Sequence, residues 1–203
     1  EFRDRALLGL PGNQEELLLR LAETGKPVIV VLTGGSAITM QHWIDKAGAI
    51  LYAWYPGEAG GIAVAEVLFG KYNPAGRLPI TFPLHEGQLP LVYNHKPTGR
   101  GDDYLNLTGQ PLFPFGFGLS YSQFSYKNLV ISPLTEERHF RATFTLTNTG
   151  TIAGEEVVQL YIRDRLASVA RPVMELKGFS RLHLAQGESR QVEFTITPEM
   201  LQM

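Results

Sequence analysis

The stretch WYPGEAGGIAVAEVLFGKYNPAGRLPITFP, Trp54 to Pro83, carries the pattern that decides the fold. It begins at the end of an apolar run, turns at Pro56-Gly57 and Gly60-Gly61, and continues into an apolar segment, residues 62–69, that predicts a helix. The exit is punctuated by turn-forming residues: Asn73, Pro74, Gly76, Pro79 and Pro83. A strand that leads through a glycine-rich loop into a helix is common in open α/β sheets, where such loops build sites.

The residues before this stretch alternate between predicted helices and strands. Asn13 is the expected N-cap of a helix that has acidic residues in its first turn and leucines on one face, to about Thr24. The β-branched run 27–33 predicts a parallel strand buried on both faces, and a second strand is expected at 49–54. A short helix is expected at 37–46. This order predicts an α/β fold with an open, mostly parallel sheet flanked by helices.

The second half of the chain changes character. Residues 71–122 hold many breakers and little regular pattern, which favours packing on the surface beside a site. They close with the aromatic run 113–121, which we interpret as a hydrophobic anchor between two domains. Runs of period two follow and predict strands: 140–147, 157–162 and 192–197. We therefore expect an α/β domain at 1–122 and an all-β, immunoglobulin-like sandwich at 123–203.

Composition excludes several classes of function. The chain has 203 residues, of which 44% are hydrophobic and 19% charged, with a net charge of −2, so a basic nucleic-acid-binding face is not expected. It has no cysteine, which excludes disulfides and thiolate metal sites, and no apolar run long enough to predict a membrane span. The first residue is Glu rather than Met and no signal peptide precedes it, so we expect a piece of a longer protein.

Several segments together resemble glycoside hydrolase family 3, the β-glucosidase family. They are Trp54–Pro83, the cluster Glu1–Arg5 with Leu10–Gln14 after it, the aromatic run 113–121, and two segments of the second domain, 155–161 and 171–179. The resemblance implies that the second domain is fibronectin type III-like, without its last strand or strands. It also implies that the chain is the C-terminal part of a retaining β-glucosidase, which needs no cofactor.

Glu1 is the candidate catalytic residue that the resemblance supplies. A retaining glycosidase needs two carboxyl groups about 5–5.5 Å apart, one a nucleophile and one a general acid/base. By the resemblance Glu1 is the acid/base, and the nucleophilic aspartate lies on an N-terminal (β/α) barrel of about 250 residues, for which this chain has no room. The chain alone is therefore predicted to be inactive. The alternative is that Glu1 is a solvated terminal residue.

Arg100 and Trp54 are weaker candidates for substrate binding. Arg100 lies in a charged, turn-rich segment, where it could border a sugar site or form an internal ion pair that holds the loop; we favour the ion pair. Trp54 could stack on a sugar, although packing of an aromatic residue at a strand end is more common. The five histidines show no ligand spacing, so no metal site is predicted.

Two other functions stay open. One is a non-catalytic module that binds carbohydrate or a partner protein. The other is a β-xylosidase, since the family includes enzymes that act on β-xylosides as well as on β-glucosides. For the glucosidase we expect a terminal non-reducing β-D-glucosyl substrate and a partner barrel in the same parent chain. We expect the parent to be periplasmic or secreted, with the cytoplasm as the alternative. Homo-oligomerisation stays open.

Overall fold

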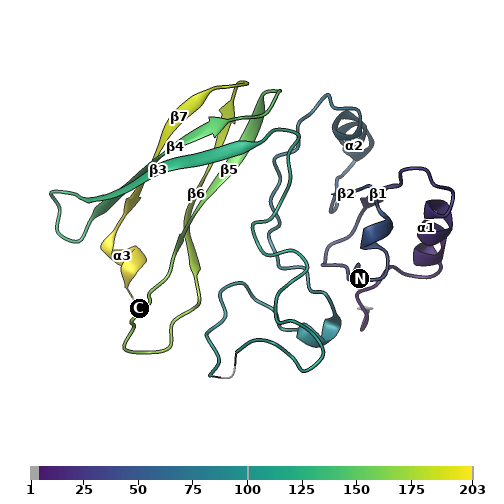
Figure 1. Cartoon of the computed structure of the whole chain (residues 1–203), viewed down its shortest axis with the longest axis horizontal. Coiled ribbons are helices and arrows are strands. Elements are labelled where there is room, and N and C mark those ends of the chain that lie inside the picture. Colours follow the sequence, from purple (N-terminus) through teal and green to yellow (C-terminus); the bar gives the residue numbers. More distant parts are fainter. Residues whose placement is uncertain (1–4, 100, 203) are drawn as a thin grey trace. The chain divides into compact units, whose positions relative to one another are not determined.

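The structure, a computed structural model, describes residues 5–99 and 101–202 and divides into two compact units (Figure 1). The α/β unit comprises the residues up to Phe69 and Leu78–Phe117. The sandwich unit comprises Gly70–Arg77 and the residues from Gly118 onward. The predicted domains, 1–122 and 123–203, place residues 70–77 in the first domain, whereas the structure groups these residues with the sandwich unit. The predicted domain boundaries stay a prediction.

The α/β unit follows the predicted order of helices and strands except between the two strands, where a 3-10 turn takes the place of the predicted helix. Its elements are α1 (Gln14–Ala22), β1 (Ile29–Leu32), the 3-10 turn η1 (Ile44–Lys46), β2 (Ala49–Tyr52), α2 (Gly60–Leu68) and the 3-10 turn η2 (Glu86–Gln88). β1 and β2 pair in parallel, with Ile29 opposite Ala49, which confirms the predicted parallel arrangement. Asn13 is the N-cap of α1 as expected, although its side chain makes no capping hydrogen bond.

The predicted helix at 37–46 is wrong. Residues 37–40 are irregular and all buried, and the only helical part of the region is the short η1. Four consecutive buried residues cannot share one face of a helix, which brings together only residues three or four apart. Met40 and Trp43 are 2% and 1% exposed. The core that they enter gathers Leu18, Leu32, Ala37, Ile38, Met40, Trp43 and Phe82.

The first strand is also less buried than predicted. Leu32 is 5% exposed, but Ile29 and Val31 are 54% and 38% exposed. In the part of the chain that the structure describes, the sheet of the α/β unit has two strands, and the core packs on one side of them. Successive side chains of a strand point to opposite faces, so the second face of β1 stays open here.

No described helix is long and apolar enough to cross a membrane.

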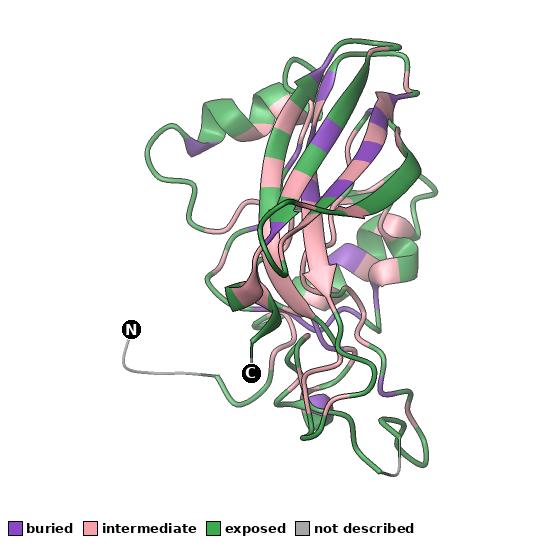
Figure 2. Cartoon of the chain, turned by 90° about the vertical axis from the view of Figure 1, so that its left-hand side faces the viewer, coloured by how far each residue is buried: buried purple, intermediate pink, exposed green. Residues whose placement is uncertain are grey.

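The second unit is the expected all-β sandwich. Its elements are β3 (Phe124–Pro133), β4 (Phe140–Asn148), β5 (Gly154–Ile162), β6 (Glu175–Leu184), β7 (Ser189–Ile196) and the short helix α3 (Pro198–Leu201). The strands form two antiparallel sheets, β3-β4-β7 and β5-β6. Buried residues alternate with more exposed ones along β4 (Figure 2), as its period-two sequence predicts. The core gathers Phe144, Leu146, Val158, Leu184 and Val192.

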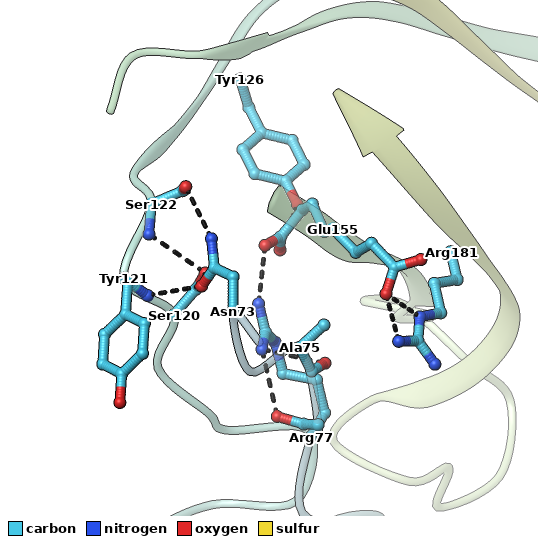
Figure 3. Close-up of polar contacts among 11 residues, drawn as sticks. Asn73, Ala75, Arg77, Ser120, Tyr121, Ser122, Tyr126, Glu155 and Arg181 are labelled. Atoms are coloured by element: carbon cyan, nitrogen blue, oxygen red, sulfur yellow. Dashed lines mark hydrogen bonds and ion pairs between the residues drawn. The ribbon is translucent and has the colours of Figure 1, made fainter. Parts of the chain in front are cut away.

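Asn73 fastens residues 70–77 to the sandwich (Figure 3). Its Oδ1 accepts hydrogen bonds from the Ser120 hydroxyl at 2.8 Å and from the Tyr121 N–H at 2.9 Å. Its Nδ2 donates to the Ser122 hydroxyl at 2.9 Å and to the Ala153 carbonyl at 2.8 Å. An asparagine amide offers two donors and two acceptor sites, so all four are used here.

Arg77 continues the same attachment with a buried charge. Its guanidinium lies 2.6 Å from Glu156 on β5, and the two side chains are 12% and 11% exposed. The second carboxylate oxygen of Glu156 accepts a hydrogen bond from the Tyr126 hydroxyl at 2.8 Å. Arg77 also donates to the carbonyls of Ala75 and Gly76 (Figure 3). The segment between α2 and the return to the α/β unit is therefore part of the sandwich in its packing and its polar contacts.

Candidate active site

The α/β unit contains a cavity of about 670 Å³ at the segment that follows Glu1. Residues 5–12 form much of its wall, together with the start of α1 and the loop before η1. Four groups that can exchange protons lie in the wall: Glu15, His42, His85 and Glu86. Carboxyl and imidazole groups are the usual general acids and bases of enzymes, so this cavity is the candidate active site.

Glu86 is the first residue of η2, a turn fixed by its neighbours. The ring Nδ1 of His85 accepts the N–H of Gly87 at 2.9 Å, and the side chain of Gln88 accepts the N–H of His85 at 3.3 Å, which completes a capping box. Gln88 is 2% exposed, and its amide nitrogen donates to two carbonyl oxygens in residues 108–110. Glu86 therefore extends from a rigid base.

The carboxylate of Glu86 collects donors from two distant segments. Its Oε1 accepts the backbone N–H of Leu8 at 2.6 Å and the hydroxyl of Thr39 at 3.3 Å. The N–H of Thr39 donates in turn to the carbonyl of Leu8 at 3.0 Å. Burial alone would raise the pKa of Glu86, but the hydrogen bonds from Leu8, from its own backbone and from Thr39 outweigh it and lower the pKa below the ordinary value. Glu86 is thus an acceptor at neutral pH and not a proton donor.

The rest of the wall is held by local contacts. Arg5 donates to the carbonyl of Gly9 at 2.6 Å, which folds residues 5–9 back on themselves. The ring of His42 lies 3.8 Å from the Glu15 carboxylate, beside the first turn of α1. The wall of the cavity thus contains both the hydrogen-bonded carboxylate of Glu86 and the His42–Glu15 pair.

The structure tests the positions of the predicted site residues only in part. Glu1 and Arg100 lie outside the described residues. Trp54 follows β2 and is half-buried, with a φ of 52°, a conformation that is uncommon for a bulky residue. Its ring packs on Tyr52 and Phe82, with centroid distances of 4.5 and 6.2 Å. Aromatic packing is the role that we favoured for Trp54, and contact with a sugar stays a prediction.

The loop around Arg100 has contacts of its own. The ring of His95 lies 3.4 Å from the Asp102 carboxylate. Asp103 Oδ1 accepts the N–H of Gly109 at 2.7 Å and the hydroxyl of Thr108 at 3.2 Å. These bonds close the loop on itself, and whether Arg100 takes part stays a prediction.

Comparison with known families decides what kind of chain this is. The profile described as "Glycosyl hydrolase family 3 C-terminal domain" matches residues 1–121, and one described as "Fibronectin type III-like domain" matches residues 156–203. The chain belongs to glycoside hydrolase family 3. The fold class that the sequence predicted, an α/β domain followed by a fibronectin type III-like sandwich, is confirmed.

Relatives within glycoside hydrolase family 3 match nearly the whole chain. The "Periplasmic beta-glucosidase" of Salmonella typhimurium is 40% identical over 99% of this chain and 28% of its own length. The "Putative beta-xylosidase" of Formosa agariphila is 42% identical over 98% of this chain and 26% of its own length. The chain thus spans little more than a quarter of these relatives.

Solved structures of the family show the same fold. The β-glucosidase EmGH1 from Erythrobacter marinus is 43% identical, with a TM-score of 0.91 over 97% of this chain and 26% of its own. A β-glucosidase from Listeria innocua, solved in complex with glucose, is 35% identical, with a TM-score of 0.89 over 97% of this chain and 29% of its own. The bound glucose belongs to the Listeria innocua enzyme.

Sequence reasoning did not single out Glu86, Thr39 or Gln88. Gln88 carries only a weak signal, since it has the capping-box spacing from His85 but histidine is not one of the usual N-cap residues. No comparable signal marks Glu86, since its partner Leu8 is 78 residues away in the chain. A contact of that kind is set by the fold and leaves no local pattern.

Proposed function

We propose that this chain is the C-terminal part of a retaining β-glucosidase that hydrolyses terminal non-reducing β-D-glucosyl residues. The observation that carries the proposal is the match of the family's C-terminal domain to residues 1–121, together with relatives named as β-glucosidases over almost all of the chain. The cavity beside the segment that follows Glu1 supports a site at this place in the α/β unit.

In the proposed reaction the chain supplies the general acid/base. The aspartate nucleophile, on the barrel of the full-length protein, attacks the anomeric carbon while Glu1 protonates the departing glycosidic oxygen. Glu1 then accepts a proton from water, whose oxygen attacks the same carbon and releases the sugar with retained configuration. Glu86 does not fit the acid role, because its donors hold the pKa low and keep it ionised.

The experiment compares the full-length protein with its Glu1→Ala variant on aryl β-glucosides. Loss of a general acid slows cleavage by about 10²–10⁴-fold when the leaving group is a poor one, and much less when it departs without protonation. We expect this dependence on the leaving group in Glu1→Ala. Full activity of the variant on a poor leaving group would show that the acid lies elsewhere.

A β-xylosidase is the second candidate, because relatives with that name match the chain as well as the glucosidases do. The two sugars differ by the C6 hydroxymethyl group, so the ratio of kcat/KM for 4-nitrophenyl β-glucoside and β-xyloside separates them. We expect the glucoside to be preferred. A preference for the xyloside would change the proposed substrate from a β-glucoside to a β-xyloside and leave the proposed reaction type unchanged.

We also propose that the full-length protein acts in the periplasm or is secreted. The support is the Salmonella relative, which is named as a periplasmic enzyme. Fractionation of cells that express the full-length gene checks this. The proposed partners are the β-glucoside and the barrel of the same protein, and the proposal requires no cofactor.

A further inference from the structure

The exposed side of the helix α2 is apolar. The more buried residues Gly60, Val64 and Val67 lie on one side of this helix, because they are three or four positions apart. Ile62 lies two positions from both Gly60 and Val64, which places it on the opposite side. Phe69 follows Ile62 two turns later, and the two side chains are 68% and 83% exposed. The exposed side of α2 is therefore not the polar side that a surface helix normally has.

The sequence of α2 does not compensate for this exposure. The helix has nine residues, begins with two glycines and contains one charged residue, Glu66. Isolated helices of this length are marginal in water, and glycine lowers helix propensity further. A helix that is apolar all round is normally buried. The stability of α2 therefore requires a second packing surface, on the side of Ile62 and Phe69.

The sheet of the α/β unit has an apolar face of the same kind. Its core packs on the face that carries Leu32. The opposite face is formed by alternate residues of the paired strands β1 and β2: Ile29, Val31, Ala49 and Leu51. All four are apolar, and none of them is fully buried. Parallel sheets occur almost only with both faces covered, so this face lacks a covering layer in the described part of the chain.

The full-length protein has enough chain to supply the missing layer. The curated relatives match this chain over 26–28% of their own length. The profile that matches residues 1–121 describes a C-terminal domain, so most of the remaining length of such a protein precedes residue 1. Apolar interfaces are typical of permanent contacts, such as those within one chain, rather than of partners that associate transiently.

We propose that the part of the full-length protein that precedes residue 1 packs on these two apolar faces, the Ile62–Phe69 side of α2 and the Ile29–Val31 face of the sheet. It completes the core of the α/β unit and removes both faces from water. The inference goes beyond the proposed function, because it depends neither on the sugar nor on the identity of the catalytic groups.

The first test places a photo-reactive residue on α2 in the full-length protein. Phe69→p-benzoylphenylalanine keeps an aromatic side chain and bonds covalently to a neighbouring C–H group under ultraviolet light. Lys26→p-benzoylphenylalanine, at an exposed polar position between α1 and β1, is the control. Mass spectrometry identifies the cross-linked peptide. A mixture of isotopically light and heavy protein separates cross-links within one chain from those between copies.

Single cysteines test both faces without a bulky probe. Residues 1–203 contain no cysteine, so Ile62→Cys and Ile29→Cys each introduce one thiol into this part of the protein, and Lys26→Cys is again the control. The reaction with N-ethylmaleimide in the native full-length protein is read from the mass of the peptide that carries the thiol. We expect the thiols at Ile62 and Ile29 to react at least about 10-fold more slowly than the control, because a covered thiol reacts only after local opening. Thermal unfolding reports whether each variant folds.

The expected cross-link joins position 69 to a peptide that precedes residue 1, in light–light and heavy–heavy pairs only. A cross-link to residues 1–203 or to a later peptide, mixed light–heavy pairs, or no more cross-linking than at Lys26 would overturn the proposal. If Phe69→p-benzoylphenylalanine fails to fold, the cysteines decide, and thiols that react as fast as the control overturn it. None of these measurements uses hydrolysis, so their failure leaves the proposed function standing, and a failure of the Glu1→Ala experiment leaves this inference standing.

Discussion

Arg77 and Glu156 are charged residues taken almost wholly out of water, each with the other as its main partner. Bringing an ion into a protein interior costs several kcal/mol, which the attraction of the partner and further hydrogen bonds offset. The Tyr126 hydroxyl supplies one such bond, and its pKa is raised by burial first and by the neighbouring carboxylate second. Each residue of this group therefore depends on the others.

The losses of stability caused by removing Arg77 and by removing the charge of Glu156 should not add, because each charge stabilises the other. Arg77→Met leaves the Glu156 carboxylate buried without its cation, and we expect a loss of about 3–5 kcal/mol in its unfolding free energy. Arg77→Met with Glu156→Gln should lose clearly less than the sum of the single variants. Calorimetry of the full-length protein measures the transition of this unit.

The control for this cycle is an exposed ion pair in the same unit. Arg141 and Glu193 lie 3.1 Å apart, with 47% and 49% of their side chains exposed. Arg141→Met should change stability by less than about 1 kcal/mol, since solvent screens the pair. Additive losses at Arg77 and Glu156 would show that the two charges are not coupled.

Glu86 predicts a dependence of stability on pH. Its pKa is lower in the folded chain than its ordinary value of 4.5, so the ionised form favours the folded state. This stabilisation is fully present above pH 4.5 and is lost as the pH falls through the lowered pKa. The difference in melting temperature between the wild type and Glu86→Gln should thus be largest near neutral pH and shrink below pH 4.5. A difference that stays constant from pH 7 to pH 3 would contradict the lowered pKa.

At the scale of elements, sequence patterns predicted the pieces whose burial follows a regular period. The helix α1, the strand β4 and the helix α2 all show such a period, and each lies within a few residues of its predicted place. Residues 37–40 escaped prediction because all of them are buried, which is neither a helical nor a strand pattern. No contact of Glu86 could be read locally, since the fold brings its partners together from distant parts of the chain.

The strand β3 was missed for a related reason. Its pairing with β4 shifts register between Lys127 and Val130, and Asn128 between them has a φ of 59°. A bulge of this kind shifts the side chains that follow it by one position, so they no longer continue the period-two pattern of a strand. Consistent with this, Leu129, Val130 and Ile131 are all more than half exposed. Because of this irregularity, a search for period-two hydrophobicity does not predict β3.

The loop between α2 and β3 contains a close approach that tolerates no side chain. A Cβ placed on Gly118 would lie 2.2 Å from the carbonyl oxygen of Gly76 and 3.0 Å from Cδ of Arg77. Gly118→Ala should therefore destabilise the sandwich unit by at least about 1–3 kcal/mol, since backbone must move to make room. Calorimetry of the full-length protein gives the shift of the melting temperature.

Gly76 is the matched control, because a Cβ there would meet no described atom within 4 Å. Gly76→Ala should change the melting temperature little, while Gly118→Ala lowers it. Similar shifts for the two variants would mean that the approach between the two backbones is looser than described.

At the scale of the whole molecule, the chain passes between its two units more than once. It enters the sandwich at Gly70, leaves after Arg77, and returns at Gly118. Residues 118–203 produced alone would lack the segment that supplies Asn73 and Arg77. We expect this piece to melt at a lower temperature than a fusion in which a flexible Gly/Ser linker joins residues 70–77 to it. Circular dichroism measures both, and equal melting temperatures would show that the segment is dispensable.

The catalytic prediction at this scale concerns the chain by itself. It spans little more than a quarter of its relatives and, in the proposed function, carries one of two required carboxyl groups. We expect it to release no 4-nitrophenol from 4-nitrophenyl β-glucoside, while the full-length protein does. Turnover by the isolated chain that survives Glu1→Ala would point to a different catalytic pair.

Asn73 has a consequence for how the protein ages. Asparagine is chemically fragile because the backbone nitrogen of the next residue can attack its side chain and release ammonia. Here the next residue is Pro74, which has no backbone N–H, and both ends of the amide are held by hydrogen bonds. The residue that fastens residues 70–77 to the sandwich is thus protected from deamidation by this route.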